Sequence, residues 1–286
     1  MSGLGTRQTQ NFNWQRTPFP VARAPPCSYA APHMGIAIET FQLARDFGNF
    51  RAVNQLDLRV EAGRFYGFLG PNGAGKSTTI KMLTGLLAPS AGRIQILGED
   101  ISDPARALAV KRRIGVVPEN LALWDNLTGR EYLTFIGRMY GMQLAVVRER
   151  AAELLAVMDL LNDEKKLTLE YSHGMKKKLA LAAALIPNPD LLFLDEPFEG
   201  VDAVASRTLR DVLKRCVERG ATVFLTSHVL EIVERLCTDV AIIARGQVVH
   251  QGSMEELRRD GSLEDKFIAV VGGNEHAGQK LSWLEA

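Results

Sequence analysis

The chain has 286 residues, enough for one large domain or two ordinary ones with a sizeable core. Its 34 basic and 33 acidic residues nearly cancel, so no overall positive charge points to a nucleic-acid partner. The three cysteines, Cys27, Cys216 and Cys237, form no CxxC pair, which argues against a disulfide framework or a zinc site. No stretch reaches the roughly 18 to 20 apolar residues that span a bilayer, so we expect any membrane role to come through a partner.

The first 33 residues contain no Asp or Glu and hold five prolines. Neither an apolar signal core nor a long amphipathic targeting helix fits this composition. We predict a disordered tail over residues 1–33. Met34 opens the first strand-like stretch, "GIAIETFQLA", which raises the hypothesis that translation starts there.

The next segments predict strands that lead into a helix. "NQLDLRVEAG" alternates apolar and polar residues with period 2, the pattern of a half-buried strand. "RFYGFLG" predicts a strand buried on both faces, and it runs directly into "GPNGAGKSTTIKMLTGLLAP". There we predict a helix over residues 76–87 that is stopped by Pro89.

A helical region follows. Thr128 and Glu131 form a capping box ahead of "YLTFIGRMYG", and "AVVRERAAELLAVMDLL" is a second amphipathic run. After Pro187 strands and helices alternate: "LLFLD", a helix from Asp202 to Gly220, "TVFLT", "VLEIVERLC", "VAIIA" and a hairpin edge "QVVHQG". The order predicts an α/β fold in which two parallel-sheet pieces flank a helical insertion.

The segment Gly70–Ser77, "GPNGAGKS", fits the phosphate-loop pattern GxxxxGK[ST]. Its glycines let backbone N–H groups face one concavity, and the following helix adds its positive end. Lys76 would span the β and γ phosphates, and the Ser77 hydroxyl would complete part of a Mg²⁺ shell. The pattern predicts a nucleotide site.

Two further strands end in polar pairs. "LLFLDEP" carries Asp195 and Glu196 at the carboxyl end of an apolar strand, the end where open α/β sheets hold their ligands. Asp195 would hold Mg²⁺, and Glu196 would take a proton from water that attacks the γ phosphate. "TVFLTSH" ends in Ser227 and His228, and an imidazole there could bridge the γ phosphate and the water.

The order of these motifs resembles the nucleotide-binding subunit of ABC transporters over residues 36–252. "GPNGAGKST" resembles the family's Walker A motif, "LLFLDEP" its Walker B motif, "EGVD" its D-loop and "TSH" its H-loop. "YSHGM" falls where the signature LSGGQ belongs. The resemblance implies a P-loop NTPase fold of the ABC type: a RecA-like parallel-sheet core with a small antiparallel β subdomain and an inserted helical subdomain.

On this basis we expect an ATPase domain over residues 34–262, with a core over 34–118 and 187–262 and a helical subdomain over 119–186. Residues 263–286 would be a short C-terminal extension, and "SLEDKFIAVVGG" resembles the tail helix of the ABC-2-like branch, which largely serves exporters.

The resemblance also implies the roles of individual residues. Glu196, His228 and Lys76 would be catalytic, and Ser77, Asp195 and Glu119 would hold the metal. Residues expected to bind ATP are Phe47, Gly70, Pro71, Asn72, Gly73, Ala74, Gly75, Lys76, Ser77 and Thr78, together with Ser172 and Gly174 from an opposing subunit. Two domains would stack head to tail, so that each ATP lies between one Walker A motif and the other signature.

The sequence departs from the family pattern at three positions. Glu119 stands where the Q-loop glutamine is expected, which puts a charge in place of a neutral amide. In the signature, His173 and Met175 replace glycine and glutamine, while Ser172 and Gly174 match. Such variants resemble those of the ABC-2-like branch, which favours an active ATPase.

We therefore expect an ATP- and Mg²⁺-dependent subunit that drives transport, with export favoured, at the cytoplasmic face of the membrane. Its partners would be integral-membrane subunits and a second ATPase subunit, not nucleic acid. Two alternatives stay open: a soluble ABC ATPase without a transport role, and a binding-only regulatory cassette.

Three lysines, Lys176, Lys177 and Lys178, occupy the first turn of a predicted helix, where each cation typically costs about 0.3 to 1 kcal/mol. For Lys177 and Lys178 we predict a solvated basic face whose stems cover the helix. We expect Lys176 to help the helix start meet a phosphate from the opposing subunit.

Overall fold

The computed structural model describes residues 35–259 and 261–271. The predictions for the tail over residues 1–33 and for a start at Met34 lie outside the described residues. The same holds for residues 272–286 of the C-terminal extension.

The larger of the two sheets in the described part of the chain has six strands in the order β10-β9-β3-β8-β7-β6. Neighbouring strands pair in parallel, except that β10 returns antiparallel to β9 as the predicted hairpin edge. The strands are β3 (Phe65–Leu69), β6 (Ile114–Val117), β7 (Leu191–Asp195), β8 (Thr222–Ser227), β9 (Asp239–Ala244) and β10 (Gln247–Ser253).

The smaller sheet has four antiparallel strands in the order β2-β1-β4-β5 within the described residues. They are β1 (Ile36–Phe47), β2 (Phe50–Glu61), β4 (Ala91–Ile96) and β5 (Glu99–Asp100). The two sheets together confirm the predicted α/β fold with a parallel-sheet core and a small antiparallel subdomain.

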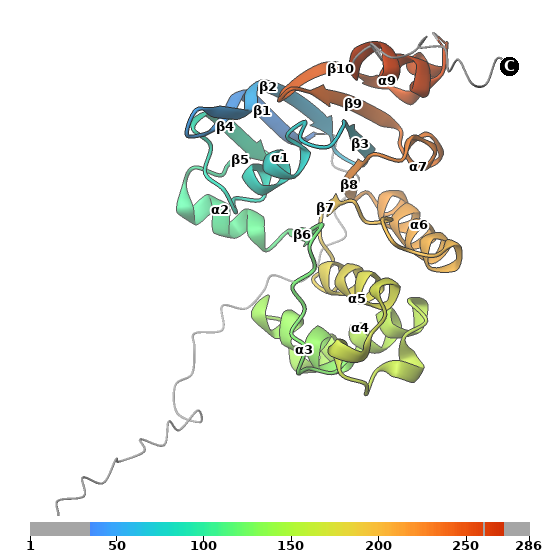
Figure 1. The fold of residues 1–286 in the computed structure, drawn as a ribbon. Coiled ribbons are helices and arrows are strands. Elements are labelled where there is room, and N and C mark those ends of the chain that lie inside the picture. The colour runs from blue at the N-terminus through green and yellow to red at the C-terminus, as the bar shows by residue number, and fades with distance from the viewer. Residues whose placement is uncertain (1–34, 260, 272–286) are drawn as a thin grey trace, which may run out of the picture.

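Helices cover both faces of the larger sheet (Figure 1). Helix α1 lies between the larger and the smaller sheet, and α2 lies beside both sheets. Helices α6 and α7 lie on the opposite face of the larger sheet. Helices α3, α4 and α5 form a separate group next to β6 and β7. The helices are α1 (Lys76–Leu83), α2 (Pro104–Lys111), α3 (Gly129–Met139), α4 (Leu144–Val157), α5 (His173–Leu185), α6 (Ala203–Glu218), α7 (Leu230–Leu236), α8 (Met254–Arg259) and α9 (Leu263–Val271).

The alternation of side chains along the buried strands separates the core into two clusters. In β7, Leu192 and Leu194 pack with α5 and α6, whereas Leu191 and Phe193 pack toward α1 and the smaller sheet. Because successive side chains of a strand point to opposite faces, a wholly apolar strand such as β7 can serve both clusters. Its carboxyl end is thereby fixed between two packed layers.

Helix α1 ends four residues earlier than predicted, at Leu83. The Thr84 hydroxyl donates to the carbonyl oxygen of Ile80 at 2.8 Å, and Gly85 adopts a left-handed φ of 66°. The amide of Leu86 then closes the helix by donating to the carbonyl of Lys81 at 2.8 Å. A glycine in this conformation ends a helix on its own, so Pro89 is not needed for the stop.

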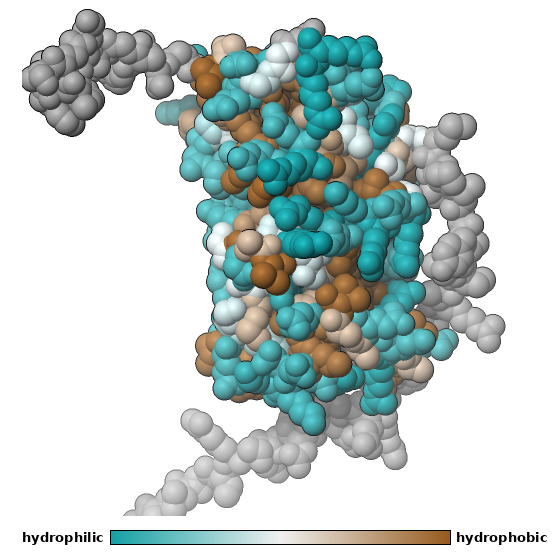
Figure 2. Space-filling view, turned by 90° about the vertical axis from the view of Figure 1, so that its right-hand side faces the viewer, coloured by the Kyte–Doolittle hydropathy of each residue, from teal (hydrophilic) through white to brown (hydrophobic). Residues whose placement is uncertain are grey.

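The helical group begins with the predicted capping box. The Glu131 amide donates to Thr128 Oγ1 at 3.2 Å, and the Thr128 amide donates to Glu131 Oε2 at 2.9 Å. None of the helices in residues 35–259 and 261–271 is long and apolar enough to cross a membrane. The face on the side of α6 and α7 is largely hydrophilic, with separate hydrophobic patches (Figure 2).

Candidate active site

The phosphate loop connects β3 to α1 and depends on glycine at several positions. Gly73 and Gly75 have φ angles of 79° and 106°, which side chains other than glycine rarely adopt. A Cβ atom at Gly70 would lie 2.4 Å from the carbonyl oxygen of Ile243, and one at Gly75 would lie 2.6 Å from that of Ala52. The loop is therefore packed tightly against β2 and β9, while Gly73 has open space around it. Such a glycine cradle fits the close approach of phosphate groups.

Lys76 is buried at the start of α1 and points back into the loop. Its Nζ donates to the carbonyl oxygen of Gly70 at 2.8 Å and lies 3.8 Å from Oε1 of Glu196. The phosphate-loop lysine and the acid after β7 are 120 positions apart in the chain, yet they share one site. A cation at this place can neutralise charge on phosphate oxygens.

Glu196 lies directly after β7 in an unusual backbone conformation. Its φ is 48°, in the left-handed region, which costs an L residue roughly 1 to 2 kcal/mol. Its side chain is only 9% exposed, and its Oε2 lies 3.1 Å from Nδ1 of His228. Thus one carboxylate contacts both the phosphate-loop lysine and the histidine that follows β8. Strained backbone at a polar site commonly accompanies a functional role.

Thr226, the penultimate residue of β8, connects the two acidic residues. Its hydroxyl donates to Oδ1 of Asp195 at 2.5 Å and accepts from the amide of Glu196 at 3.1 Å. Thr226 is fully buried, as is nearly all of Asp195. Thr226 was not among the residues predicted for the site, although a threonine inside the apolar run "TVFLTS" is a signal that could have pointed to it.

The residues expected to hold Mg²⁺ offer the oxygen donors that this ion prefers. The Ser77 hydroxyl donates to Oε2 of Glu119 at 3.3 Å, so the acidic residue at the Q-loop position reaches the phosphate-loop serine. Asp195 supplies a second carboxylate at the end of β7. In the described ranges no three acidic, histidine or cysteine side chains converge as a metal-binding group. A hydroxyl and separate carboxylates fit an ion that a nucleotide phosphate also holds.

Phe47 ends β1 at the tip of the β1–β2 hairpin. Its side chain is 46% exposed, and the guanidinium carbon of Arg45 lies 4.7 Å from its ring centroid. A cation in this position fixes one face of an aromatic ring. The exposed remainder of the ring is free to stack on a base.

The signature segment forms the N-terminus of α5. Ser172 is the N-cap, and its Oγ accepts from the amide of Met175 at 3.3 Å. A Cβ atom at Gly174 would lie 3.6 Å from Oδ2 of Asp202, and the ring of His173 packs against Gly200, so the signature contacts the D-loop of the same chain. Ser172 is exposed.

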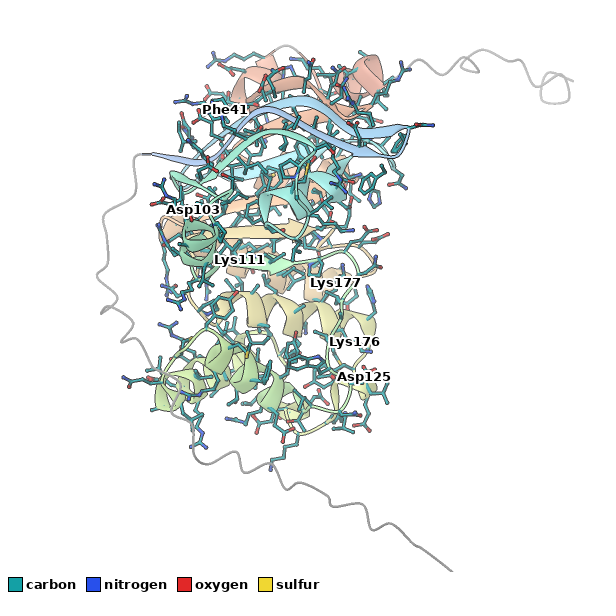
Figure 3. All side chains as sticks on the ribbon, turned by 90° about the vertical axis from the view of Figure 1, so that its left-hand side faces the viewer. Phe41, Asp103, Lys111, Asp125, Lys176 and Lys177 are labelled. Atoms are coloured by element: carbon teal, nitrogen blue, oxygen red, sulfur yellow. The ribbon has the colours of Figure 1, made fainter. Side chains whose placement is uncertain are left out.

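The prediction of a solvated face for Lys177 and Lys178 is wrong. Lys177 is 2% exposed and Lys178 is 8% exposed, because the first turn of α5 lies beneath the end of β7. Figure 3 shows Lys177 on the side of α5 that faces the strands and Lys176 on the side toward Asp125. Lys177 Nζ donates to the carbonyl oxygen of Glu196 at 2.9 Å. Lys178 Nζ lies 3.9 Å from Oδ2 of the exposed Asp159.

Comparisons with known proteins agree with this site. The ABC transporter family model matches residues 53–199. The daunorubicin/doxorubicin resistance ATP-binding protein DrrA of Streptomyces peucetius is 43% identical over 223 residues, which cover 78% of this chain and 67% of that protein. The Nod factor export ATP-binding protein I of Cupriavidus pinatubonensis is 37% identical over 249 residues, 87% of this chain and 76% of that protein.

A solved ATP-binding subunit of an ABC transporter superposes with a TM-score of 0.76 at 29% identity, covering 82% of this chain and 99% of that one. The chain therefore belongs to the ABC transporter family. Within that family it is an ATP-binding subunit with the ATPase fold.

Proposed function

We propose that this chain hydrolyses ATP in a head-to-tail dimer and thereby drives export by separate integral-membrane subunits at the cytoplasmic face of the membrane. The observation that supports this most is the carboxylate of Glu196, which lies 3.8 Å from Lys76 Nζ and 3.1 Å from His228 Nδ1. An acid in this position is next to the loop that would hold the γ phosphate. The export activity named for the Nod factor relative favours the same direction here.

Hydrolysis of ATP requires a water molecule to be positioned and deprotonated. As the water oxygen attacks the γ phosphorus, the bond to the bridging oxygen breaks, ADP leaves with the electron pair, and Glu196 accepts the proton. His228 holds the Glu196 carboxylate in place, and Lys76 stabilises charge on the phosphate oxygens. Ser77, Asp195 and Glu119 would hold Mg²⁺, which when bound neutralises the charge that develops on the phosphates.

A second copy of the chain would complete each site. Ser172 lies exposed at the N-terminus of α5, and Gly174, two residues further on, carries no side chain; a Cβ atom there would meet only Oδ2 of Asp202 within 4 Å. The first turn of α5 has no acidic residue, so its positive end is not neutralised from within the turn. A phosphate group from the opposing subunit fits this surface.

A membrane subunit would dock on the helical group. Exposed apolar side chains on this group include Trp124, Leu167 and Leu169. The segment with Trp124 and the segment with the two leucines are hydrogen-bonded to each other, because Thr168 Oγ1 donates to the carbonyl oxygen of Trp124 at 2.7 Å. Exposed apolar side chains gathered in this way are typical of protein contacts. We assign this surface to a cytoplasmic segment of the membrane partner.

A binding-only regulatory cassette is the second candidate, and one observation favours it. The contact between Glu119 Oε2 and Ser77 Oγ puts a negative charge at the metal position in place of a neutral amide. Such a charge could bind Mg²⁺ while it alters the coupling to the partner. The arrangement of Lys76, Glu196 and His228 supports the hydrolytic function over this alternative.

The test is to isolate the protein at its native level and to assay it together with whatever it binds. We expect it to be recovered from the membrane fraction with an integral-membrane protein, and to hydrolyse ATP in a Mg²⁺-dependent way that Lys76→Met abolishes. Recovery only with ribosomes or free in solution would contradict the transport function. A wild-type complex without ATPase activity would favour the binding-only cassette.

A further inference from the structure

Lys177 is a buried lysine that connects α5 to the residue proposed as the general base. It is 2% exposed, and its Nζ donates to the backbone carbonyl oxygen of Glu196 at 2.9 Å. The two residues lie on different elements, since Lys177 is in the first turns of α5 and Glu196 follows β7. None of the roles described above uses this contact.

The contact acts on a backbone that is held from both sides. The amide of Glu196 donates to Thr226 Oγ1 at 3.1 Å, and its carbonyl accepts from Lys177. The φ of 48° at Glu196 lies in the left-handed region, where a non-glycine residue persists only if its surroundings hold it. Thr226 fixes the peptide group before Glu196, and Lys177 fixes the one after it. The direction of the Glu196 side chain therefore depends on the position of Lys177.

The same helix begins with the signature segment. Ser172, the N-cap of α5, is five residues before Lys177, so about one and a half helical turns separate them. An α-helix moves as a rigid element over this length. A shift or rotation of the N-terminus of α5 is therefore passed to the carbonyl group of Glu196.

The surroundings of Lys177 show why a charged donor suits this place. Burial lowers the pKa of Lys177, whereas the carboxylates of Glu199, Asp195, Glu119 and Glu196 oppose that shift. Four acidic groups from the D-loop, the end of β7 and the Q-loop position thus act on one ammonium group. A hydrogen bond from a charged donor is stronger and more directional than one from a neutral donor.

We propose that Lys177 is a positioning residue that couples the two ATP sites of the dimer: ATP bound against the signature of one subunit moves α5 and, through Lys177, aligns Glu196 in that subunit's own site. The proposal rests on the head-to-tail dimer of the proposed function. It explains the buried lysine at a helix start where a cation is otherwise unfavourable.

The experiment compares Lys177→Met with Lys178→Met in the full-length protein, assayed with its membrane partner. Lys178 is the matched control because it is the next residue of α5, is also buried, and has its ion-pair contact with Asp159 instead of Glu196. For Lys177→Met we expect kcat to fall roughly 10- to 100-fold, which is typical when a catalytic group is displaced from its reacting position. The KM for ATP should change little, because the phosphate loop is intact. We expect the Hill coefficient for ATP to fall from above 1 to about 1.

Lys178→Met should keep the wild-type Hill coefficient and a kcat within about twofold of wild type. Because both lysines are buried, we expect the melting temperature to fall in both variants. Lys177→Arg, which keeps a charged donor, should restore most of the cooperativity. If Lys177→Met does not fold, Lys177→Gln removes the charge with a polar group retained, and the same results are expected. Equal kcat and Hill coefficients for the Lys177 and Lys178 variants, or a wild-type Hill coefficient of about 1, would overturn the proposal. Failure of the proposed function is seen separately, as an absence of ATP-dependent dimers in Glu196→Gln.

Discussion

His228 Nδ1 and Glu196 Oε2 lie 3.1 Å apart, at the ends of two adjacent parallel strands. The histidine follows β8 and is half-exposed, whereas the glutamate follows β7 and is almost completely buried. The buried acid is thus held by a side chain that remains open to the surface. A ligand that contacts His228 would therefore lie one side chain away from the group that would receive the proton.

Replacement of His228 by alanine should separate hydrolysis from binding. Without the imidazole, the Glu196 carboxylate loses its contact with Nδ1 and keeps the one with Lys76, and we expect kcat to fall about 10²- to 10⁴-fold. The affinity for ATP should change little, because the phosphate loop is intact. Steady-state ATPase assays and titration with a fluorescent ATP analogue measure the two quantities. A loss of affinity that accounts for the whole effect would contradict the assigned role.

Thr226→Val should reduce both stability and turnover. The substitution removes the hydroxyl that donates to Asp195 and accepts from Glu196, and it leaves buried polar groups without that partner at a cost of about 1 to 3 kcal/mol. Urea unfolding measures the loss of stability, and ATPase assays measure the loss of turnover.

Thr222→Val is the matched control for this prediction. Thr222 lies at the opposite end of β8, is also buried, and its Oγ1 accepts from the amide of Gly63 at 2.9 Å. We expect a comparable loss of stability with turnover retained. Equal losses of turnover in both variants would mean that the effect of Thr226 is general destabilisation.

Phe47→Ala should weaken ATP binding. Stacking of a base on an aromatic ring is worth about 1 to 3 kcal/mol, so we expect the KM for ATP to rise by roughly 5- to 150-fold. Phe50, on the other side of the same hairpin turn, is more exposed and provides the control. The stacking assignment fails if Phe50→Ala raises the KM as much as Phe47→Ala does, or if Phe47→Ala leaves it unchanged.

Lys176→Glu should weaken ATP-driven dimerisation more than it destabilises the monomer. Lys176 is the half-buried lysine of the three, on the side of α5 away from the strands (Figure 3). A carboxylate near the helix start would interact favourably with the helix but repel a phosphate from the second subunit. Sedimentation with ATP and thermal unfolding measure the two effects. An unchanged dimerisation constant would mean that Lys176 has no part in the ATP site formed between the two subunits.

The sequence predicted the sheet core and the phosphate loop because their signals are local. The apolar composition of β3, β7 and β8 predicts buried strands. The carboxyl ends of parallel strands lie at one edge of the sheet, so the polar residues that follow β7 and β8 were expected to lie close together there. The proximity of Lys76 and Glu196 follows from the same topology. The capping box of α3 depends only on neighbouring residues, which is why it was predictable.

The contacts that the sequence could not give depend on how elements pack. Lys177 and Lys178 have the composition of a surface face, and only the position of α5 beneath the end of β7 buries them. The link from Thr226 to Asp195 and Glu196 joins residues about thirty positions apart on neighbouring strands. The early end of α1 arises from the conformation of Gly85, which Pro89 downstream obscured.

In the proposed dimer, two copies of this chain share each ATP between a phosphate loop and an opposing signature. The most direct test is light scattering with size-exclusion chromatography on Glu196→Gln, with and without ATP and Mg²⁺, alone and combined with Gly174→Arg. Because Glu196→Gln removes the proposed base and leaves the binding residues intact, it should form a dimer only when ATP is present. The added Gly174→Arg should keep the protein monomeric while the monomer still binds ATP. A Glu196→Gln protein that stays monomeric with saturating ATP, or a double variant that dimerises as well as the single one, would rule out the head-to-tail dimer.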